Sequence, residues 1–180
     1  TGPAIGDVFC RIWNSCGISI RYLFITPAPE IMAYTKVTPY VDGFIYITAS
    51  HNPIGYHGIK GGLSDGSVLQ GSENARLVNR IREKAASETA LHKAGQMLTE
   101  NQAKALEQVL DQVPEWKKEA LEAYNRFTRM VITNEDTPEQ QNAILQAVER
   151  SAEGSLAILG DLNGSARTLS IDKNIFDDCG

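Results

Sequence analysis

The hydrophobic side chains of residues 3–16 recur at i, i+3, i+4 and i+7, which is the spacing of an amphipathic helix. Pro3 suits the first turn of a helix, and Gly17 suits the position just after one, where a left-handed backbone is common. The pattern therefore predicts a helix over residues 3–16. Its apolar positions are Ile5, Val8, Phe9, Ile12 and Cys16.

Two apolar runs follow that have the length of strands rather than of helices. Residues 18–25 alternate at first and then become wholly apolar, and Pro27 ends the run. A short helix is expected from Pro29. A second strand is expected over residues 43–48, which lack polar alternation and so predict burial on both faces. The Asp65-Gly66 pair indicates a tight hairpin turn, and the order helix, strand, helix, strand predicts an α/β fold.

Residues 72–153 have a different character, because glycines become scarce and charged residues alternate with Leu, Val and Ala. Three apolar stripes at helical spacing predict helices, and Pro114 separates the second from the third. After the helices, residues 155–161 predict one more buried strand. The two helix starts that fit a capping box are Thr99 with Gln102 and Thr137 with Gln140. The stripes are Leu77, Ile81 and Ala85; Leu106, Val109, Leu110 and Val113; and Trp116, Ala120, Tyr124, Phe127 and Val131.

We therefore expect the chain to divide into three parts. Residues 1–71 form an α/β domain with a mixed sheet packed between helices. Residues 72–153 form a helical segment that leads into a second domain, and residues 154–180 are the start of that second α/β domain. The chain begins with Thr1 and closes on a stretch without a terminating element, which leads us to expect a piece of a longer protein.

Composition narrows the function classes. The chain has 180 residues, of which 42% are hydrophobic and 22% charged, and these ordinary values exclude a disordered or collagen-like chain. A net charge of -5 without a basic block argues against a broad nucleic-acid surface, and no apolar run is long enough to cross a membrane. Three cysteines without a CxxC pair indicate neither a disulfide framework nor a zinc cluster, and fit a cytoplasmic protein.

The most informative stretch joins a small hydroxyl residue to a base and a cation. Ser50 follows a buried strand, at the end where ligands of open α/β sheets bind, and His51 and Asn52 adjoin it. Glycines at 55 and 58 let the backbone approach a ligand, and Lys60 returns a positive charge to the same neighbourhood. This set suits covalent catalysis on an anionic group such as phosphate. The alternative is a polar turn in which Ser50 caps a helix and Lys60 is an ordinary surface lysine.

The string Thr48-Ala49-Ser50-His51-Asn52-Pro53, with Gly58-Ile59-Lys60 after it, resembles the active-site signature of the α-D-phosphohexomutase superfamily. This superfamily comprises the phosphoglucomutases and phosphomannomutases. Residues 29–34 resemble the segment that precedes the serine strand in that family, and residues 160–164 resemble the opening of its second domain. The resemblance implies that residues 1–71 are phosphohexomutase domain 1 and that the chain is an isomerase of carbohydrate metabolism.

The resemblance also implies a role for each residue of the signature. Ser50 would be a phosphoserine that exchanges its phosphoryl group with a hexose phosphate, so that 1-phosphates and 6-phosphates interconvert through a sugar 1,6-bisphosphate. Lys60 would stabilise the transferred charge or accept a proton, and His51 would orient the sugar hydroxyl or exchange a proton with it. Thr48 and Asn52 would shape the substrate loop. The phosphate on Ser50 would be one ligand of a Mg²⁺ ion, and glucose 1,6-bisphosphate would be the primer.

One element of the family pattern is absent from the sequence. The family holds Mg²⁺ with an Asp-Gly-Asp-x-Asp-Arg loop, and no such string occurs here. We therefore expect this polypeptide alone to turn over little or nothing and to work with the remaining domains of a parent enzyme. We also expect it to self-associate if helical faces such as the Trp116–Phe127 stripe lie exposed.

Several alternatives remain open from the sequence. Phosphoglucosamine mutase shares the scaffold, although its usual motif has Ser where Thr48 stands. A phosphatase would pass the phosphoryl group from Ser50 to water. A non-catalytic reading makes residues 72–153 an interaction module and the serine loop an anion-binding site. Residues 163–167 fit either a phosphate-cradling turn or a plain connection into a helix. Cys10, Cys16 and His57 match no zinc spacing.

Overall fold

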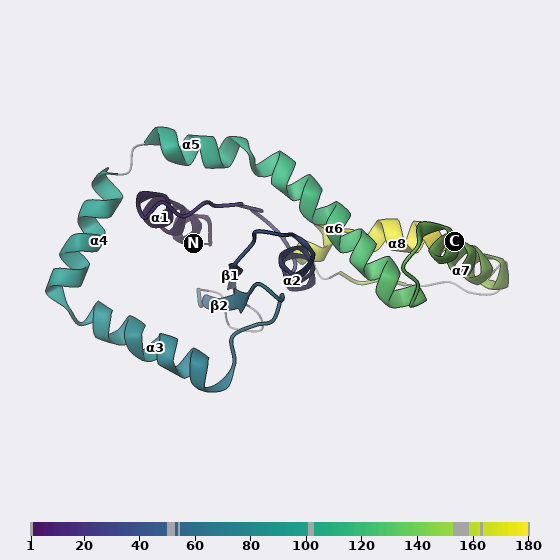
Figure 1. Cartoon of the computed structure of the whole chain (residues 1–180), viewed down its shortest axis with the longest axis horizontal. Helices are drawn as coiled ribbons and strands as arrows, with labels where there is room; N and C mark the ends of the chain where they lie inside the picture. The colour runs from purple at the N-terminus through teal and green to yellow at the C-terminus, as the bar shows by residue number, and fades with distance from the viewer. Residues whose placement is uncertain are drawn as a thin grey trace.

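A computed structural model of the chain describes residues 2–49, 53, 55–100, 103–152, 159–162 and 164–179. Helices and a small sheet alternate in the first half, and helices fill the second (Figure 1), so the predicted α/β class is confirmed. The elements in chain order are α1 (Gly2–Ser15), α2 (Ala28–Val37), β1 (Gly43–Thr48), β2 (Gly58–Leu63), α3 (Gly71–Ala85), α4 (Glu88–Glu100), α5 (Ala103–Asp111), α6 (Val113–Thr133), α7 (Pro138–Ala152), the 3₁₀ helix η1 (Ala166–Leu169) and α8 (Asp172–Cys179).

Helix α1 ends as its sequence predicts. Gly17 has a φ of 72°, in the left-handed region, and its N–H donates to the carbonyl of Asn14 at 3.0 Å. The N–H of Ile18 donates to the carbonyl of Trp13, also at 3.0 Å. These two bonds satisfy carbonyls that the last turn of a helix leaves without partners, and Gly17 adopts the required backbone without a steric penalty. The helix predicted over residues 3–16 is confirmed.

The strand predicted over residues 18–25 is wrong, because these residues belong to neither a helix nor a strand. Some of their side chains pack against helices, whereas Ile18, Phe24 and Ile25 are exposed. Leu23 is buried in the core, and Arg21 bonds to side chains of α2 and α6. Phe24 has a φ of 59°, so the extended backbone is interrupted there. The apolar run therefore reflects packing on helices rather than strand pairing.

The sheet is an antiparallel pair of β1 and β2, in which Thr48 lies opposite Gly58 and Gly43 opposite Leu63. The strand predicted over residues 43–48 is confirmed, but each of its residues is half-buried, so burial on both faces is wrong. The predicted turn follows β2. The carboxylate of Asp65 accepts from the N–H of Ser67 at 2.8 Å, and the chain folds back so that Val68 bridges Gly62. The hydrogen bonds from Ser67 lower the pKa of the Asp65 carboxyl.

The helical segment is confirmed and forms an arc. Helices α3, α4 and α5 pass around α1, and α6 then runs back across α2 towards α7 and α8 (Figure 1). Pro114 lies in the first turn of α6, as predicted. Thr137 caps α7, since the N–H of Gln140 donates to its hydroxyl at 3.4 Å. Thr99 lies within the span of α4 and Gln102 lies outside the described residues, so the cap predicted there stays a prediction.

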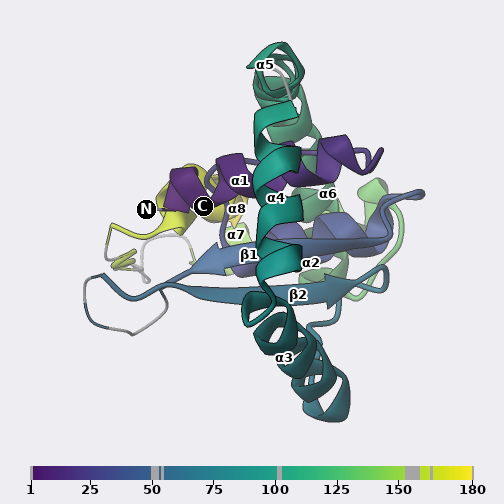
Figure 2. The same cartoon turned by 90° about the vertical axis from the view of Figure 1, so that its left-hand side faces the viewer.

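The hydrophobic core lies between α2 and α6. It consists of the buried residues Leu23, Tyr34, Ala120 and Ala123, with Ile31 and Trp116 packed against them. The guanidinium of Arg21 stacks over the Trp116 ring at 4.5 Å from its centroid and covers the edge of this core. Trp116 and Ala120 of the predicted stripe thus pack on α2, whereas Val131 at its end is 60% exposed. Figure 2 shows α1 above the β1–β2 pair, and α2 packs beside β1.

The last part of the chain contains η1 and α8. Of the strand predicted over residues 155–161, positions 155–158 lie outside the described residues, and positions 159–161 belong to neither a helix nor a strand. The division into domains at 71 and 153 stays a prediction. Among the described helices, none combines the length and the apolarity that a membrane span requires.

Candidate active site

The structure describes both sides of the predicted serine loop. Ser50, His51 and Asn52 themselves lie outside the described residues, so their predicted roles remain predictions. Thr48 ends β1, and Gly58 begins β2 directly opposite it. The two ends of the loop are therefore fixed to each other by the strand pairing.

The register of the sheet places Lys60 relative to the loop. Lys60 lies opposite Tyr46, two residues along the strands from the Thr48–Gly58 pair. Directly paired residues share a face of an antiparallel sheet, and side chains two apart on a strand do as well, so Thr48, Tyr46 and Lys60 lie on one face. Two residues of strand span about 7 Å, which the flexible four-carbon stem of a lysine can bridge. Lys60 is exposed, and its ammonium can reach the end of β1.

Two glycines, Gly58 and Gly62, lie two positions to either side of Lys60 on the same face of the hairpin. A Cβ at Gly62 would lie 1.9 Å from Cε1 of Phe44, so the Phe44 ring covers this glycine and fills that side. On the other side, a Cβ at Gly58 would be 3.3 Å from the carbonyl oxygen of Thr48. The Phe44 ring therefore occupies the Gly62 side of Lys60, whereas the Gly58 side carries no side chain of its own. Sequence reasoning missed the part played by Phe44 and Tyr46, which only the strand register reveals.

The loop returns to β2 through an exposed turn. The N–H of Tyr56 donates to the carbonyl of Pro53 at 3.1 Å, and Gly55 has a φ of 98°, which favours glycine. Tyr56 and His57 are exposed. This turn places backbone and a histidine at the surface beside the candidate site.

The fit to Mg²⁺ was tested on the donor groups of the described residues. These residues hold no group of three or more His, Cys, Asp or Glu side chains that could bind a metal ion. Mg²⁺ prefers several oxygen ligands in octahedral geometry. The described donors thus do not form a Mg²⁺ site among themselves. Cys10 is buried in α1, where burial raises the pKa of its thiol, whereas Cys16 is exposed.

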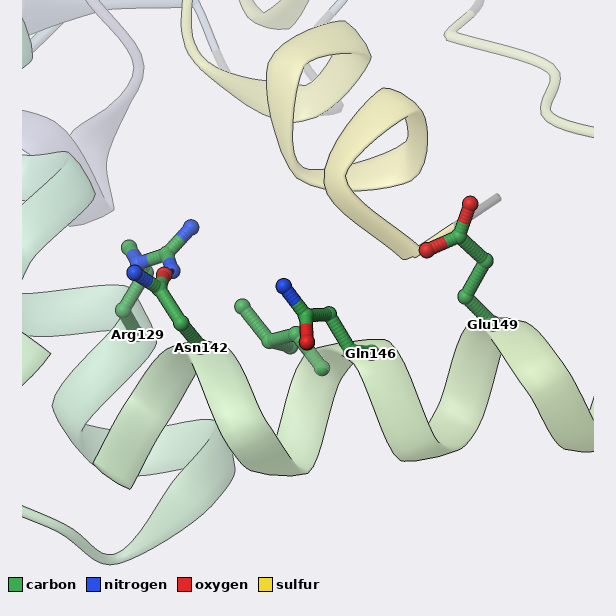
Figure 3. Close-up of a pocket in the computed structure, with 5 residues that line it drawn as sticks. Arg129, Asn142, Gln146 and Glu149 are labelled. Carbon is green, nitrogen blue, oxygen red and sulfur yellow. Dashed lines mark hydrogen bonds between the residues drawn. The ribbon is translucent and has the colours of Figure 1, made fainter. Parts of the chain in front are cut away.

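A second candidate is a polar pocket between α6 and α7 (Figure 3). Its volume is about 290 Å³, and it is lined by Arg129, Asn142, Leu145, Gln146 and Glu149. The guanidinium of Arg129 donates to the side-chain oxygen of Asn142. Ligand sites are usually lined mostly by apolar side chains, and this lining is largely polar. No sequence motif falls here, so the serine loop remains the stronger candidate.

The turn before η1 is built as a helix cap. The hydroxyl of Ser165 accepts from the N–H of Arg167 at 3.4 Å, and the guanidinium of Arg167 pairs with the Asp172 carboxylate. Asn163 lies outside the described residues. Because the charge of Arg167 is already paired, the plain connection explains this turn better than a phosphate cradle does.

The first part of the chain is similar to a known protein family. Residues 1–88 match the family model described as phosphoglucomutase/phosphomannomutase, alpha/beta/alpha domain I. This match supports the phosphohexomutase superfamily for residues 1–88, here called the phosphohexomutase segment. The phosphohexomutase segment runs from α1 to the end of α3, and it contains every residue predicted for the site. Searches of curated proteins and of solved structures found no match to this chain.

Proposed function

We propose that the phosphohexomutase segment carries a phosphoryl group on Ser50 and exchanges it with a hexose phosphate. The supporting observation is the β1–β2 register, which puts Lys60 and Thr48 on one face beside the serine loop in a segment that matches the family. The net reaction interconverts hexose 1-phosphate and hexose 6-phosphate. It is an intramolecular phosphotransfer with a sugar 1,6-bisphosphate as intermediate.

In this proposal, the oxygen of a sugar hydroxyl attacks the phosphorus of phosphoserine 50. The bond between phosphorus and the serine oxygen breaks, and the hydroxyl proton passes by way of His51 or Lys60 to the serine oxygen, which leaves as a free hydroxyl. The reverse step returns the other phosphoryl group of the bisphosphate to Ser50. Negative charge spreads over the transferring oxygens, so a positioned cation accelerates the step. Lys60 supplies that charge, while Thr48 and Asn52 hold the substrate phosphate.

The family's Mg²⁺ would neutralise part of the phosphate charge, and it enters this proposal only as an ion bound to the phosphate on Ser50. Glucose 1,6-bisphosphate is the primer. Thr48 favours glucose or mannose phosphates over glucosamine phosphate, for which the usual motif has serine. We place the reaction in the cytoplasm, with hexose phosphates and other domains of the enzyme as partners.

Self-association is part of the proposal because apolar side chains lie exposed on the helical arc. Ile81 on α3 is 58% exposed and Leu91 on α4 is 55% exposed. Two exposed large apolar side chains on adjoining helices favour contacts between copies of the chain.

Phosphoryl loading of Ser50 tests the function directly. The chain is incubated with glucose 1,6-bisphosphate and Mg²⁺, and its proteolytic peptides are examined by mass spectrometry. We expect phosphate on Ser50 and none in Ser50→Ala. Lys60→Met should slow loading by about 100-fold or more, as loss of one transition-state donor does. Lys84→Met, which removes an exposed lysine of α3, is the matched control and should load normally.

Three outcomes separate the competing functions. Loading without hydrolysis, with total organic phosphate retained, supports a mutase, whereas release of inorganic phosphate indicates a phosphatase. Binding of the bisphosphate without loading, unchanged in Ser50→Ala, would favour the anion-binding module. A mutase assay on the same preparation checks the expectation that this polypeptide alone has no family-like turnover.

A further inference from the structure

A glutamate that the proposed chemistry does not use is completely buried. Glu30 lies in the first turn of α2 and has 0% of its surface exposed. Its carboxylate accepts from the ammonium of Lys117 on α6 at 2.5 Å and from the hydroxyl of Ser170 at 2.7 Å. Lys117 is 87 positions away along the chain and Ser170 is 140 positions away. One side chain thus joins three distant segments.

Glutamate is almost never fully buried unless it is paired, because a buried charge must be compensated. Here both carboxylate oxygens have partners, one on Lys117 and one on Ser170. The surroundings are also charged. Asp172 is nearly buried and pairs with Arg167, and burial together with Asp172 raises the pKa of Tyr124. Removing one partner of such a group leaves a charge without compensation in the interior.

Glu30 is connected to the candidate site through α2. This helix packs against β1, which ends at Thr48. The turn after β2 also touches α2, since a Cβ at Gly66 would lie 2.4 Å from the carbonyl oxygen of Met32. Both strands of the hairpin that carries Thr48 and Lys60 are therefore supported by the helix that Glu30 holds.

We propose that Glu30 is a positioning residue of the serine site. It fixes α2 to α6 and to the turn before α8, and α2 in turn holds the β1–β2 pair in the arrangement that brings Lys60 towards Thr48. The catalytic consequence rests on the proposed function, whereas the structural consequence does not. The part of the chain beyond the family match is thus assigned a task, which is to brace the phosphohexomutase segment through α2.

The test uses the full chain and removes one hydroxyl. In Ser170→Ala, amide hydrogen exchange measured by mass spectrometry should become about tenfold faster in α2, β1 and β2, because a hydrogen bond to a buried charge is lost. Exchange in α3 and α4 should not change. Ser170→Thr, which keeps a hydroxyl, should restore the original rates. Ser151→Ala, which removes an exposed hydroxyl bonded within α7, is the matched control.

A charge-pair cycle provides a second measurement. Glu30→Gln and Lys117→Met should each accelerate exchange in the same elements more than Ser170→Ala does. In the double variant, the fold-acceleration should be smaller than the product of the fold-accelerations of the two single variants. Unchanged exchange in Ser170→Ala, or an equal increase in α3 and α4, overturns the proposal. The proposal is also overturned if the fold-acceleration in the double variant equals the product of those in the two single variants.

The catalytic part is read from loading of Ser50 by glucose 1,6-bisphosphate. Ser170→Ala should lower the maximal loading rate about tenfold and leave the half-saturating concentration unchanged, because a displaced Lys60 affects the transfer step more than ground-state binding. An unchanged maximal rate would overturn the positioning role. If Ser50 of the unaltered chain takes up no phosphoryl group, the proposed function fails. The hydrogen-exchange result then still decides whether Glu30 holds α2 in place.

Discussion

The α2–α6 contact and the β1–β2 hairpin differ in how much of each is removed from water. In the contact, Glu30 and Ala120 are 0% exposed, and Thr35 is 1% exposed. In the hairpin, every residue of β1 is only half-buried, and Lys60 on β2 is exposed. Apolar burial is the main favourable term in folding, so the stability of this part of the molecule comes from the helices. The candidate chemistry lies on the less covered element.

The same comparison shows how the phosphohexomutase segment is completed. Its core residues Leu23 and Tyr34 pack against Ala120 and Ala123 of α6, which lie beyond the matched residues. The matched segment therefore shares its core with the helical segment rather than enclosing one of its own. Substitutions in the two regions should consequently have different effects.

The largest expected effect on the free energy of unfolding comes from a substitution in the α2–α6 contact. Leu23→Ala should lower the free energy of unfolding by about 2–5 kcal/mol, because it leaves a cavity between α2 and α6. Ile59→Ala on β2, where the side chain is 53% exposed, should change it by less than about 1 kcal/mol. Denaturant unfolding of both variants provides the measurement. Equal losses from the two would contradict the difference between the regions.

A smaller effect tests a tightly packed point of the hairpin, Gly62 against the Phe44 ring. Gly62→Ala should cost about 1–3 kcal/mol, because the added Cβ would meet the Phe44 ring and force it to move. Phe44→Leu in the same chain should recover part of the loss, since the smaller side chain leaves room. Thermal unfolding of the single and double variants measures this. A neutral Gly62→Ala would show that the ring moves freely.

The smallest expected effect on the free energy of unfolding comes from the hydrogen bond between Tyr34 on α2 and Glu119 on α6. Tyr34 donates to Glu119 at 2.6 Å, and burial and this hydrogen bond raise the pKa of its phenol from 10.0 to about 12. The contribution of this hydrogen bond to the free energy of unfolding is complete below pH 10, because the phenol is then protonated in both the folded and the unfolded chain. It is lost between pH 10 and pH 12, where the unfolded chain ionises first.

Unfolding free energy should therefore fall by up to about 2 kcal/mol over that range of pH. In Tyr34→Phe, this part of the fall should be absent. Urea unfolding at pH 9 and pH 11.5 measures the difference between the two chains. If the unfolding free energy falls equally with pH in both chains, the pKa of Tyr34 is the same in the folded and the unfolded state.

Local signals in the sequence predicted the structure well. Gly17 ends α1 and Thr137 caps α7, because each acts on backbone groups within a few residues. The neighbourhood of Thr48 and Lys60 was also predicted, since a short loop between two strands keeps its ends together. The β1–β2 register, and with it Phe44 and Tyr46, was not, because it depends on cross-strand contacts.

Distant contacts explain the failures. Residues 18–25 have the composition of a strand, but Leu23 and Arg21 find partners on α2 and α6. Nothing near Glu30 in the sequence indicates that it is buried, because a glutamate is normally exposed and its partners are far along the chain. Tertiary packing of this kind overrides local propensity.

The separation of Glu30 from Ser170 also has a consequence for the order in which the protein is made. The β1–β2 hairpin is local and can pair once Leu63 has left the ribosome, whereas the bond to Ser170 spans 140 positions. At ordinary rates of synthesis, the stretch between Leu63 and Ser170 takes about 5–20 s to appear. During that interval the carboxylate of Glu30 has only water as a partner or, later, Lys117. The nascent chain thus possesses its candidate catalytic hairpin before it possesses all the contacts that hold that hairpin in place.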